Sequence, residues 1–168
     1  MTKSIFRICM ILALGLAASQ MTLSAQERHS LTGVWDVTVV VTNCQTGAPI
    51  RTVRSVQGFS PDGSFTETAN TSLRGSSVGV WHHVDQHWNQ AGERIYSANY
   101  WFFRYNADGT FASIAQAVDM VELSEDGSQF NASGTIQDFN ANNVLLSTGC
   151  FTHTAKRLSG PVTAGEVE

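Results

Sequence analysis

Tight-turn signals recur along the chain at short intervals and limit what it can fold into. Three Asp-Gly pairs stand between runs of apolar and β-branched residues, each shortly before a phenylalanine. Glycine accepts the positive φ angle that hairpin turns require, so Asp-Gly between such runs predicts a β-hairpin. A fourth turn is predicted over residues 140–143, which are rich in Asn. The three pairs are Asp62-Gly63, Asp108-Gly109 and Asp126-Gly127.

Cutting the chain at these turns leaves a series of candidate strands. They are rich in Val, Thr and aromatic residues, and no window sustains a helical period with start and stop signals. Short connections throughout predict an all-β, eight-stranded antiparallel up-and-down barrel, because closure removes exposed strand edges. A two-sheet sandwich is the alternative fold. The strands are expected at 31–43, 50–59, 64–70, 77–86, 94–105, 110–123, 128–139 and 143–157.

Alternation along the first expected strand indicates which side faces the interior. Trp35, Val37 and Val39 fall on one face, whereas Asp36 and Thr38 fall on the other. Successive side chains on a strand point to opposite faces, so we expect the odd-numbered residues to point inward. A barrel of this strand number encloses either packed side chains or one small ligand.

The N-terminus has the pattern of an export signal. Lys3 and Arg7 precede an apolar run over residues 8–18, which suits a secretory signal and is too short to span a bilayer. Leu23-Ser24-Ala25 is a candidate cleavage site, and an earlier cut after Ser19 is the alternative. We therefore expect an exported protein, either periplasmic or secreted. Its expected parts are a signal peptide (1–25), a lipocalin-like barrel domain (26–158) and a flexible C-terminal tail (159–168).

Two cysteines lie beyond the expected signal, Cys44 and Cys150. In an oxidising compartment they are expected to form one disulfide, with two separate thiols as the alternative. Neither belongs to a Cys-x-x-Cys pair, which argues against a metal site. If the two cysteines lay directly opposite each other on paired first and last strands, residue 37 would face residue 157. Arg157 would then lie diagonal to Trp35 and could cover its indole ring.

Charge excludes one class of partner. The chain has 10 Lys and Arg against 14 Asp and Glu, spread evenly, so no basic face for nucleic acid can be assembled. No apolar run reaches the length of a membrane-spanning helix, so no span is expected once the signal is removed.

The segment Gly33-Val34-Trp35 resembles the Gly-x-Trp signature of the lipocalins and their calycin relatives. In that superfamily the tryptophan closes one end of the barrel and a basic residue near the last strand packs across it. The resemblance gives Gly33, Trp35 and Arg157 these structural roles, with Lys156 as the neighbouring candidate, and it covers residues 30–158. The second and third lipocalin signature segments and the helix after the barrel are missing. The chain is thus most similar to small exported bacterial barrels of lipocalin-like shape.

One dense polar and aromatic cluster runs from Trp81 to residue 88. On a strand, His83, Asp85 and His87 share a face with Trp81. His83 and His87 are spaced too widely to hold one metal unless the chain turns between them, so no metal site is predicted. Paired with a histidine, Asp85 could support acid–base catalysis, which makes His83, Asp85 and His87 the catalytic candidates. The alternative is a polar strand end at the barrel mouth.

Aromatic residues fill both faces of the expected fifth strand. They are predicted either to fill the core or to wall an apolar pocket with a few polar anchors. Small residues on the expected sixth strand, such as Ala115 and Ala117, favour a cavity over a filled core. The candidate ligand-binding residues are Trp81, His83, Tyr96, Asn99, Tyr100, Trp101 and Phe102.

The leading functional hypothesis is an exported barrel that binds a small, mainly hydrophobic molecule without a cofactor. Signatures of hydrolases and phosphate-binding loops are not present in the sequence. One alternative is an isomerase or hydratase that uses His83, Asp85 or His87. The other is an interaction module that acts through the long connections, residues 44–50 and 70–77.

Overall fold

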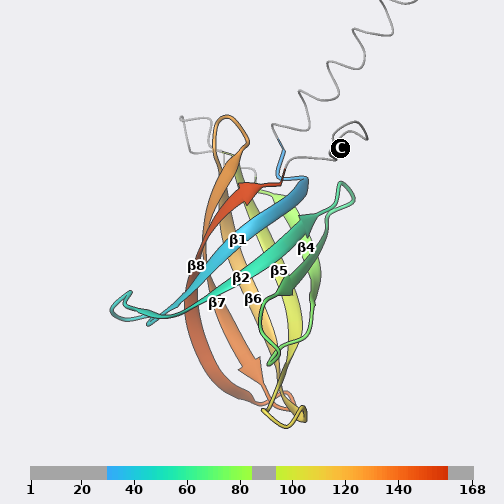
Figure 1. The fold of residues 1–168 in the computed structure, drawn as a ribbon, viewed down its shortest axis with the longest axis vertical. Helices are drawn as coiled ribbons and strands as arrows, with labels where there is room; N and C mark the ends of the chain where they lie inside the picture. Colours follow the sequence, from blue (N-terminus) through green and yellow to red (C-terminus); the bar gives the residue numbers. More distant parts are fainter. Residues whose placement is uncertain (1–29, 85–93, 159–168) are drawn as a thin grey trace, which may run out of the picture.

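A computed structural model describes residues 30–84 and 94–158 of the chain. They form a closed antiparallel barrel in which each strand pairs with its neighbours in sequence and the last pairs with the first (Figure 1). The predicted all-β, eight-stranded up-and-down barrel is confirmed, and its shape is consistent with a lipocalin-like fold. The strands are β1 (Gly33–Thr42), β2 (Pro49–Phe59), β3 (Ser64–Ala69), β4 (Ser77–His83), β5 (Arg94–Tyr105), β6 (Phe111–Leu123), β7 (Gln129–Phe139) and β8 (Leu145–Arg157).

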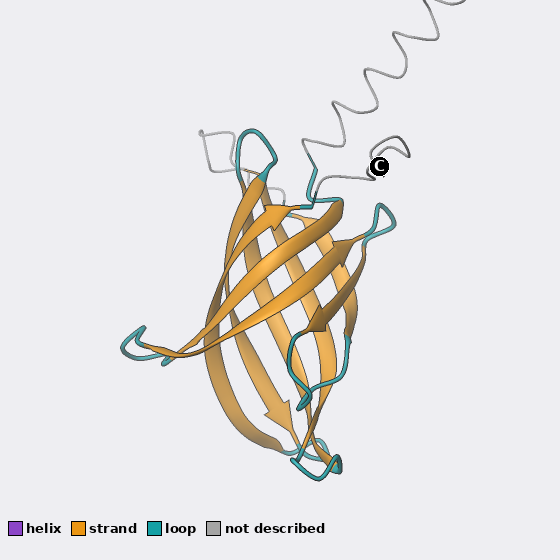
Figure 2. Cartoon of the chain, in the orientation of Figure 1, coloured by secondary structure: helices purple, strands orange, loops and turns teal. Residues whose placement is uncertain are grey.

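Strands and turns account for the described part of the chain, as Figure 2 shows. Among these residues, no helix is long and apolar enough to cross a membrane. The expected signal peptide (1–25) and tail (159–168) lie outside the described residues.

The hairpin turns share one local geometry. Gly63, Gly109 and Gly127 have φ angles of 84°, 82° and 69°, as the Asp-Gly signals predict. In each turn the aspartate accepts hydrogen bonds from the backbone N–H and the hydroxyl of the residue that follows the glycine, which is Ser64, Thr110 or Ser128. Asn143 takes the same role in the fourth turn, with φ 59°. Asparagine tolerates this conformation better than most residues, which explains why that turn needs no glycine.

Pairing of β1 with β8 closes the barrel, in a register two residues away from the expected one. Trp35 lies directly opposite Arg157, and Thr42 lies opposite Cys150. The expected disulfide joins Cys44 and Cys150, with their Cα atoms 5.1 Å apart. The assumption that the cysteines are themselves strand partners was wrong, because Cys44 lies beyond the end of β1 and reaches back to β8. The disulfide indicates a non-cytoplasmic setting.

Trp35 and Arg157 close one end of the barrel. Trp35 is fully buried, donates its indole N–H to the carbonyl oxygen of Leu31, and packs edge-on against Phe130. The Arg157 guanidinium lies 4.2 Å from the indole ring and donates hydrogen bonds to the carbonyl oxygens of Gly127, Thr32 and Ser30. The expected stacking of Arg157 on Trp35 is thus present.

Gly33 leaves the space that this arginine occupies. A Cβ atom at residue 33 would lie 2.6 Å from an Arg157 guanidinium nitrogen, and the Gly33 φ angle is 139°. Both the contact and the backbone conformation require glycine here.

Large aromatic side chains fill the interior next to this closed end. Phe59 packs against Phe65, Trp81 and Phe130, and Phe65 packs against Tyr100. The odd-numbered face of β1 points inward as predicted, with Trp35 and Val37 fully buried. Ala115 and Ala117 of β6 are also fully buried, in the same core cluster as aromatic side chains from other strands.

We expect the disulfide to stabilise the barrel by about 4 kcal/mol, because it closes a long loop in the unfolded chain. The double variant Cys44→Ser/Cys150→Ser should therefore unfold at a clearly lower urea concentration than the oxidised protein. Reduced wild-type protein is the control and should match the variant. Equal midpoints for oxidised protein and variant would contradict the expectation.

Arg157→Met keeps much of the packing on Trp35 but removes the hydrogen bonds that close the barrel end. We expect it to lower the free energy of unfolding by about 2–4 kcal/mol, because several carbonyl acceptors lose a charged donor. Lys156→Met, whose side chain is exposed on the outer face of the same strand, is the matched control. Chemical denaturation of the two variants measures the difference, and an equal effect of both would show that Arg157 does not hold this end.

Candidate functional site

The end of the barrel opposite Trp35 contains a cavity. Its volume is about 60 Å³, which is room for a few water molecules. The connections β1–β2, β3–β4, β5–β6 and β7–β8 surround this open end (Figure 1). Its apolar wall comes from five strands and consists of Val39, Val41, Val53, Phe102, Ile136 and Phe151. Its polar lining includes Arg51, Glu67, Arg74, Tyr100, Arg104 and His153.

Glu67 is the most buried acid of this lining, with 2% of its surface exposed. It forms an ion pair with Arg74 from the β3–β4 connection, and the Ser77 hydroxyl donates to it at 2.7 Å. The Gln57 amide also donates to Glu67, at 3.4 Å. Burial acts to raise the pKa of Glu67, but Arg74 and Ser77 outweigh burial and lower it. Glu67 is therefore held as a carboxylate inside the barrel.

Asp119 and His153 form a second buried pair. The distance from His153 Nδ1 to Asp119 Oδ2 is 3.4 Å. Burial, followed by the nearby charge of Glu67, raises the pKa of Asp119 to about 7. Burial lowers the pKa of His153 to about 4. Between these pH values the pair is two neutral groups rather than an ion pair, because the interior disfavours both charged forms.

Tyr100 lines the cavity beside these groups. It is buried, its ring packs on Phe65 at 4.6 Å, and it lines the cavity together with Glu67 and His153. Burial, followed by the charges of Asp119 and Glu67, raises the pKa of the Tyr100 hydroxyl well above its ordinary value. The hydroxyl is therefore available as a neutral hydrogen-bond donor.

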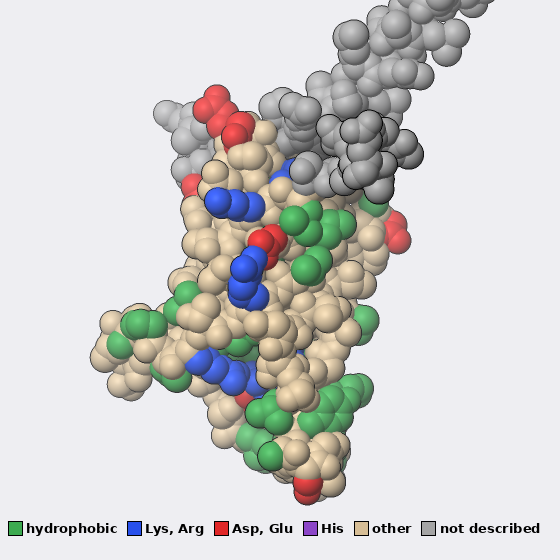
Figure 3. Space-filling view, in the orientation of Figure 1, with side chains coloured by type: hydrophobic (Ala, Val, Ile, Leu, Met, Phe, Trp, Pro, Cys, Tyr) green, Lys and Arg blue, Asp and Glu red, His purple; other side chains and the backbone are tan. Residues whose placement is uncertain are grey.

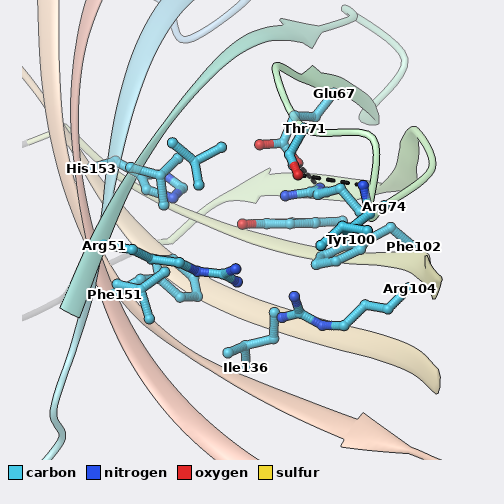
Figure 4. Close-up of a pocket in the computed structure, with 14 residues that line it drawn as sticks. Arg51, Glu67, Thr71, Arg74, Tyr100, Phe102, Arg104, Ile136, Phe151 and His153 are labelled. Atoms are coloured by element: carbon cyan, nitrogen blue, oxygen red, sulfur yellow. Dashed lines mark hydrogen bonds and ion pairs between the residues drawn. The ribbon is translucent and has the colours of Figure 1, made fainter. Parts of the chain in front are cut away.

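Three arginines reach the cavity from different elements, and Figure 4 shows their guanidinium groups pointing into the same space. Arg74 lies over the Phe102 ring at 3.5 Å, and Arg104 lies 5.1 Å from the centre of the same ring. Arg104 donates to Asp138 at 2.6 Å. Arg51, from β2, has no hydrogen bond or ion pair with any residue that the structure describes.

Several buried polar atoms beside the cavity lack partners. Within the described ranges, no hydrogen bond reaches Arg74 Nε, His153 Nδ1, Asp119 Oδ1 or the Ser55 hydroxyl. Unpartnered polar atoms are costly in an interior, and they are normally satisfied by water or by a ligand. The open end therefore has both the space and the hydrogen-bonding capacity for a small polar group.

The candidate ligand-binding residues are divided between three places. Tyr100 and Phe102 line the open-end cavity. Tyr96, Trp81 and His83 lie at the closed end, where Tyr96 packs edge-on against the other two rings. Asn99 and Trp101, the remaining candidates, lie on the outer face of the barrel, which answers the question of which face of β5 is interior. They alternate with Tyr100 and Phe102 along β5 and therefore point outward, and Asn99 accepts a hydrogen bond from Gln116 on that outer face.

The candidate catalytic residues are not brought together. His83 lies at the end of β4, away from the open-end cavity, and lines a shallow hollow with Pro61, Asp62 and Trp81. Asp85 and His87 lie outside the described residues. Among the residues that are described, no group of three His, Cys, Asp or Glu side chains could hold a metal ion.

The residues that the sequence did not single out are Arg51, Glu67, Arg74, Asp119 and His153. The buried strand residues among them are each two residues from a buried apolar residue and therefore point to the same face, as Glu67 does with Phe65 and His153 with Phe151. A charged residue on the inward face of a strand was therefore the available signal.

No protein-family model, no curated protein and no solved structure matches this chain. The interpretation of the site therefore depends on its geometry.

Replacing Asp119 by Asn should stabilise the protein increasingly as the pH rises. An acid whose pKa is raised by folding lowers stability as the pH rises above its unfolded pKa, because the unfolded state ionises there while the buried carboxyl keeps its proton. The gain of Asp119→Asn over wild type should grow by about 3 kcal/mol from about pH 5 to about pH 8. Urea unfolding at both pH values measures it.

Glu122→Gln is the matched control, because Glu122 is an exposed carboxyl on the outer face of the same strand. The gain in free energy of unfolding over wild type should increase with pH much more for Asp119→Asn than for Glu122→Gln. Parallel behaviour of the two variants would contradict a raised pKa at Asp119.

Proposed function

We propose that the barrel binds a small, mainly hydrophobic molecule at its open end. The observation that carries this proposal is the cavity whose apolar wall is built by Val39, Val53, Ile136 and Phe151. A mostly apolar concave site with a few polar groups is the usual form of a small-molecule site. The aromatic core next to Trp35 leaves the other end filled, so the ligand enters at the open end.

The size of the cavity determines how such a ligand is held. About 60 Å³ is far below the roughly 300–1,000 Å³ of a site that encloses a whole drug-sized molecule. Only one end of the ligand therefore enters the barrel. The remainder lies against exposed apolar side chains on the surrounding connections and strand ends, which include Ile50, Leu73, Val144, Leu145 and Leu146. Figure 3 shows apolar side chains gathered at this end of the molecule.

The proposal includes export. Residues 1–25 direct the chain out of the cytoplasm as a signal peptide, and the mature protein acts in the periplasm or outside the cell. The disulfide between Cys44 and Cys150 supports this location, because such bonds persist in oxidising compartments.

Acid–base catalysis at the open end is the second candidate function. It is favoured by the buried His153, Asp119 and Glu67, which have shifted pKa values beside a cavity. This candidate site is not the one expected from His83, Asp85 and His87. His83 lies at the closed end of the barrel, and the other two lie outside the described residues. Turnover of a bound ligand that is lost in His153→Gln would favour catalysis over binding alone.

Binding can be tested with N-phenyl-1-naphthylamine, a neutral apolar fluorophore. We expect its emission to increase on binding to the wild-type protein. Val53→Trp should weaken binding by about tenfold or more, because the larger side chain fills the cavity. Val56→Trp is the matched control, since Val56 is exposed on the outer face of the same strand.

Circular dichroism of both variants confirms that they fold. A wild-type protein that does not bind the fluorophore, or a folded Val53→Trp variant that binds it as well as Val56→Trp does, would overturn the proposed site.

A further inference from the structure

Positive charge is in excess around the open-end cavity. Arg51, Arg74 and Arg104 all line it, whereas the carboxylates that pair with them are Glu67 and Asp138. Glu67 neutralises Arg74, and Asp138 neutralises Arg104. Arg51 is exposed and has no protein partner in residues 30–84 or 94–158, so it presents an unpaired positive charge to solvent and to the mouth of the cavity.

Backbone pairing brings two of these arginines close together. Arg74 and Arg104 are partners in an isolated antiparallel bridge, flanked by hydrogen bonds from Gly75 N–H to Phe103 and from Tyr105 N–H to Leu73. Both guanidinium groups then pack on Phe102. Each of these two guanidinium groups already pairs with a carboxylate, so the excess positive charge at the cavity is that of Arg51. An anion bound beside Arg51 would also be attracted by the two arginines on Phe102.

Unused donors around the cavity point to the same chemistry. Arg74 Nη2 already donates to Glu67 and Ser77, but the buried Nε–H of Arg74 has no acceptor in the described part of the chain. Arg51 contributes further donors. Guanidinium groups form their strongest hydrogen bonds with anionic oxygen atoms, often in pairs. The missing partner is therefore an acceptor with negative charge.

We propose that the ligand is an amphiphilic anion, and that its carboxylate, phosphate or sulfate group binds among Arg51, Arg74 and Arg104. This inference rests on the proposed function and specifies its ligand class. The cavity is large enough for such a head group, and the apolar wall formed by Val41, Val53 and Ile136 leads from it. The apolar part of the ligand then lies toward the rim.

A series of twelve-carbon compounds tests the head group at constant tail length. The compounds are laurate, dodecyl phosphate, dodecanol and dodecyltrimethylammonium, each used below its micelle concentration in competition with N-phenyl-1-naphthylamine. At least one of the two anions should bind about tenfold or more tightly than dodecanol, and the cation should bind more weakly than dodecanol. The better anion identifies the preferred head group.

Arg51→Gln isolates the contribution of the unpaired arginine. It should weaken binding of the preferred anion by about tenfold and leave dodecanol binding unchanged. Arg54→Gln is the matched control, because Arg54 lies on the outer face of the same strand and pairs with Asp36. Raising the salt concentration should also weaken binding of the anion but not of dodecanol.

The outcomes separate this inference from the proposed function. If dodecanol binds as tightly as both anions, or if Arg51→Gln and Arg54→Gln bind the anion equally well, the barrel is a ligand-binding protein but the anion site is wrong. If neither the fluorophore nor any member of the series binds to the folded wild-type protein, both proposals are wrong.

Discussion

Closure of the sheet between β1 and β8 is the constraint on which the other features depend. It sets Trp35 directly opposite Arg157, so that one cationic side chain covers the indole and reaches the carbonyl oxygens of the N-terminal segment and of the β6–β7 turn. Closure also decides which face of every strand is interior. Because side chains alternate along a strand, one register places Val37, Tyr100 and His153 inside together.

The interior is divided along the barrel axis. Aromatic side chains pack around Trp35 at the closed end, whereas charged and polar groups occupy the part next to the open end. Buried charges usually stabilise a fold less than well-packed apolar side chains would. Glu67 keeps its charge because Arg74 and Ser77 outweigh the effect of burial, whereas burial, followed by the charge of Glu67, makes Asp119 harder to ionise. The polar network therefore stabilises the barrel less than an apolar core of the same volume would. Binding of a ligand is the simplest reason for polar groups in this part of the interior.

Local patterns in the sequence predicted the strands, the turns, the disulfide and the pairing of Arg157 with Trp35. Asp-Gly turns and alternation act over a few residues, so they can be recognised without knowing the fold. The expected pairing of the first and last strands was wrong by two residues because Cys44 lies just beyond the end of β1. Where the strand ends depends on the conformation of the β1–β2 connection, which alternation does not predict. Which face of β5 is interior could not be predicted, because both faces are aromatic, and the structure turns Asn99 and Trp101 outward. The polar lining of the cavity was missed because Arg51, Glu67 and His153 are isolated in sequence and meet only when the sheet closes.

The position of the disulfide has a consequence for where the barrel can hold a ligand. The bond ties the β1–β2 hairpin to β8, next to Val41 and Phe151 in the wall of the cavity. With the thiols reduced, the strand pairing that sets Val41 opposite Phe151 remains, but the β1–β2 connection is no longer tied covalently to β8, and ordering it uses part of the free energy of association. If the barrel binds a ligand as we propose, we expect full affinity in the oxidised protein and weaker binding after reduction. The disulfide would then couple ligand binding to the redox state of the surroundings.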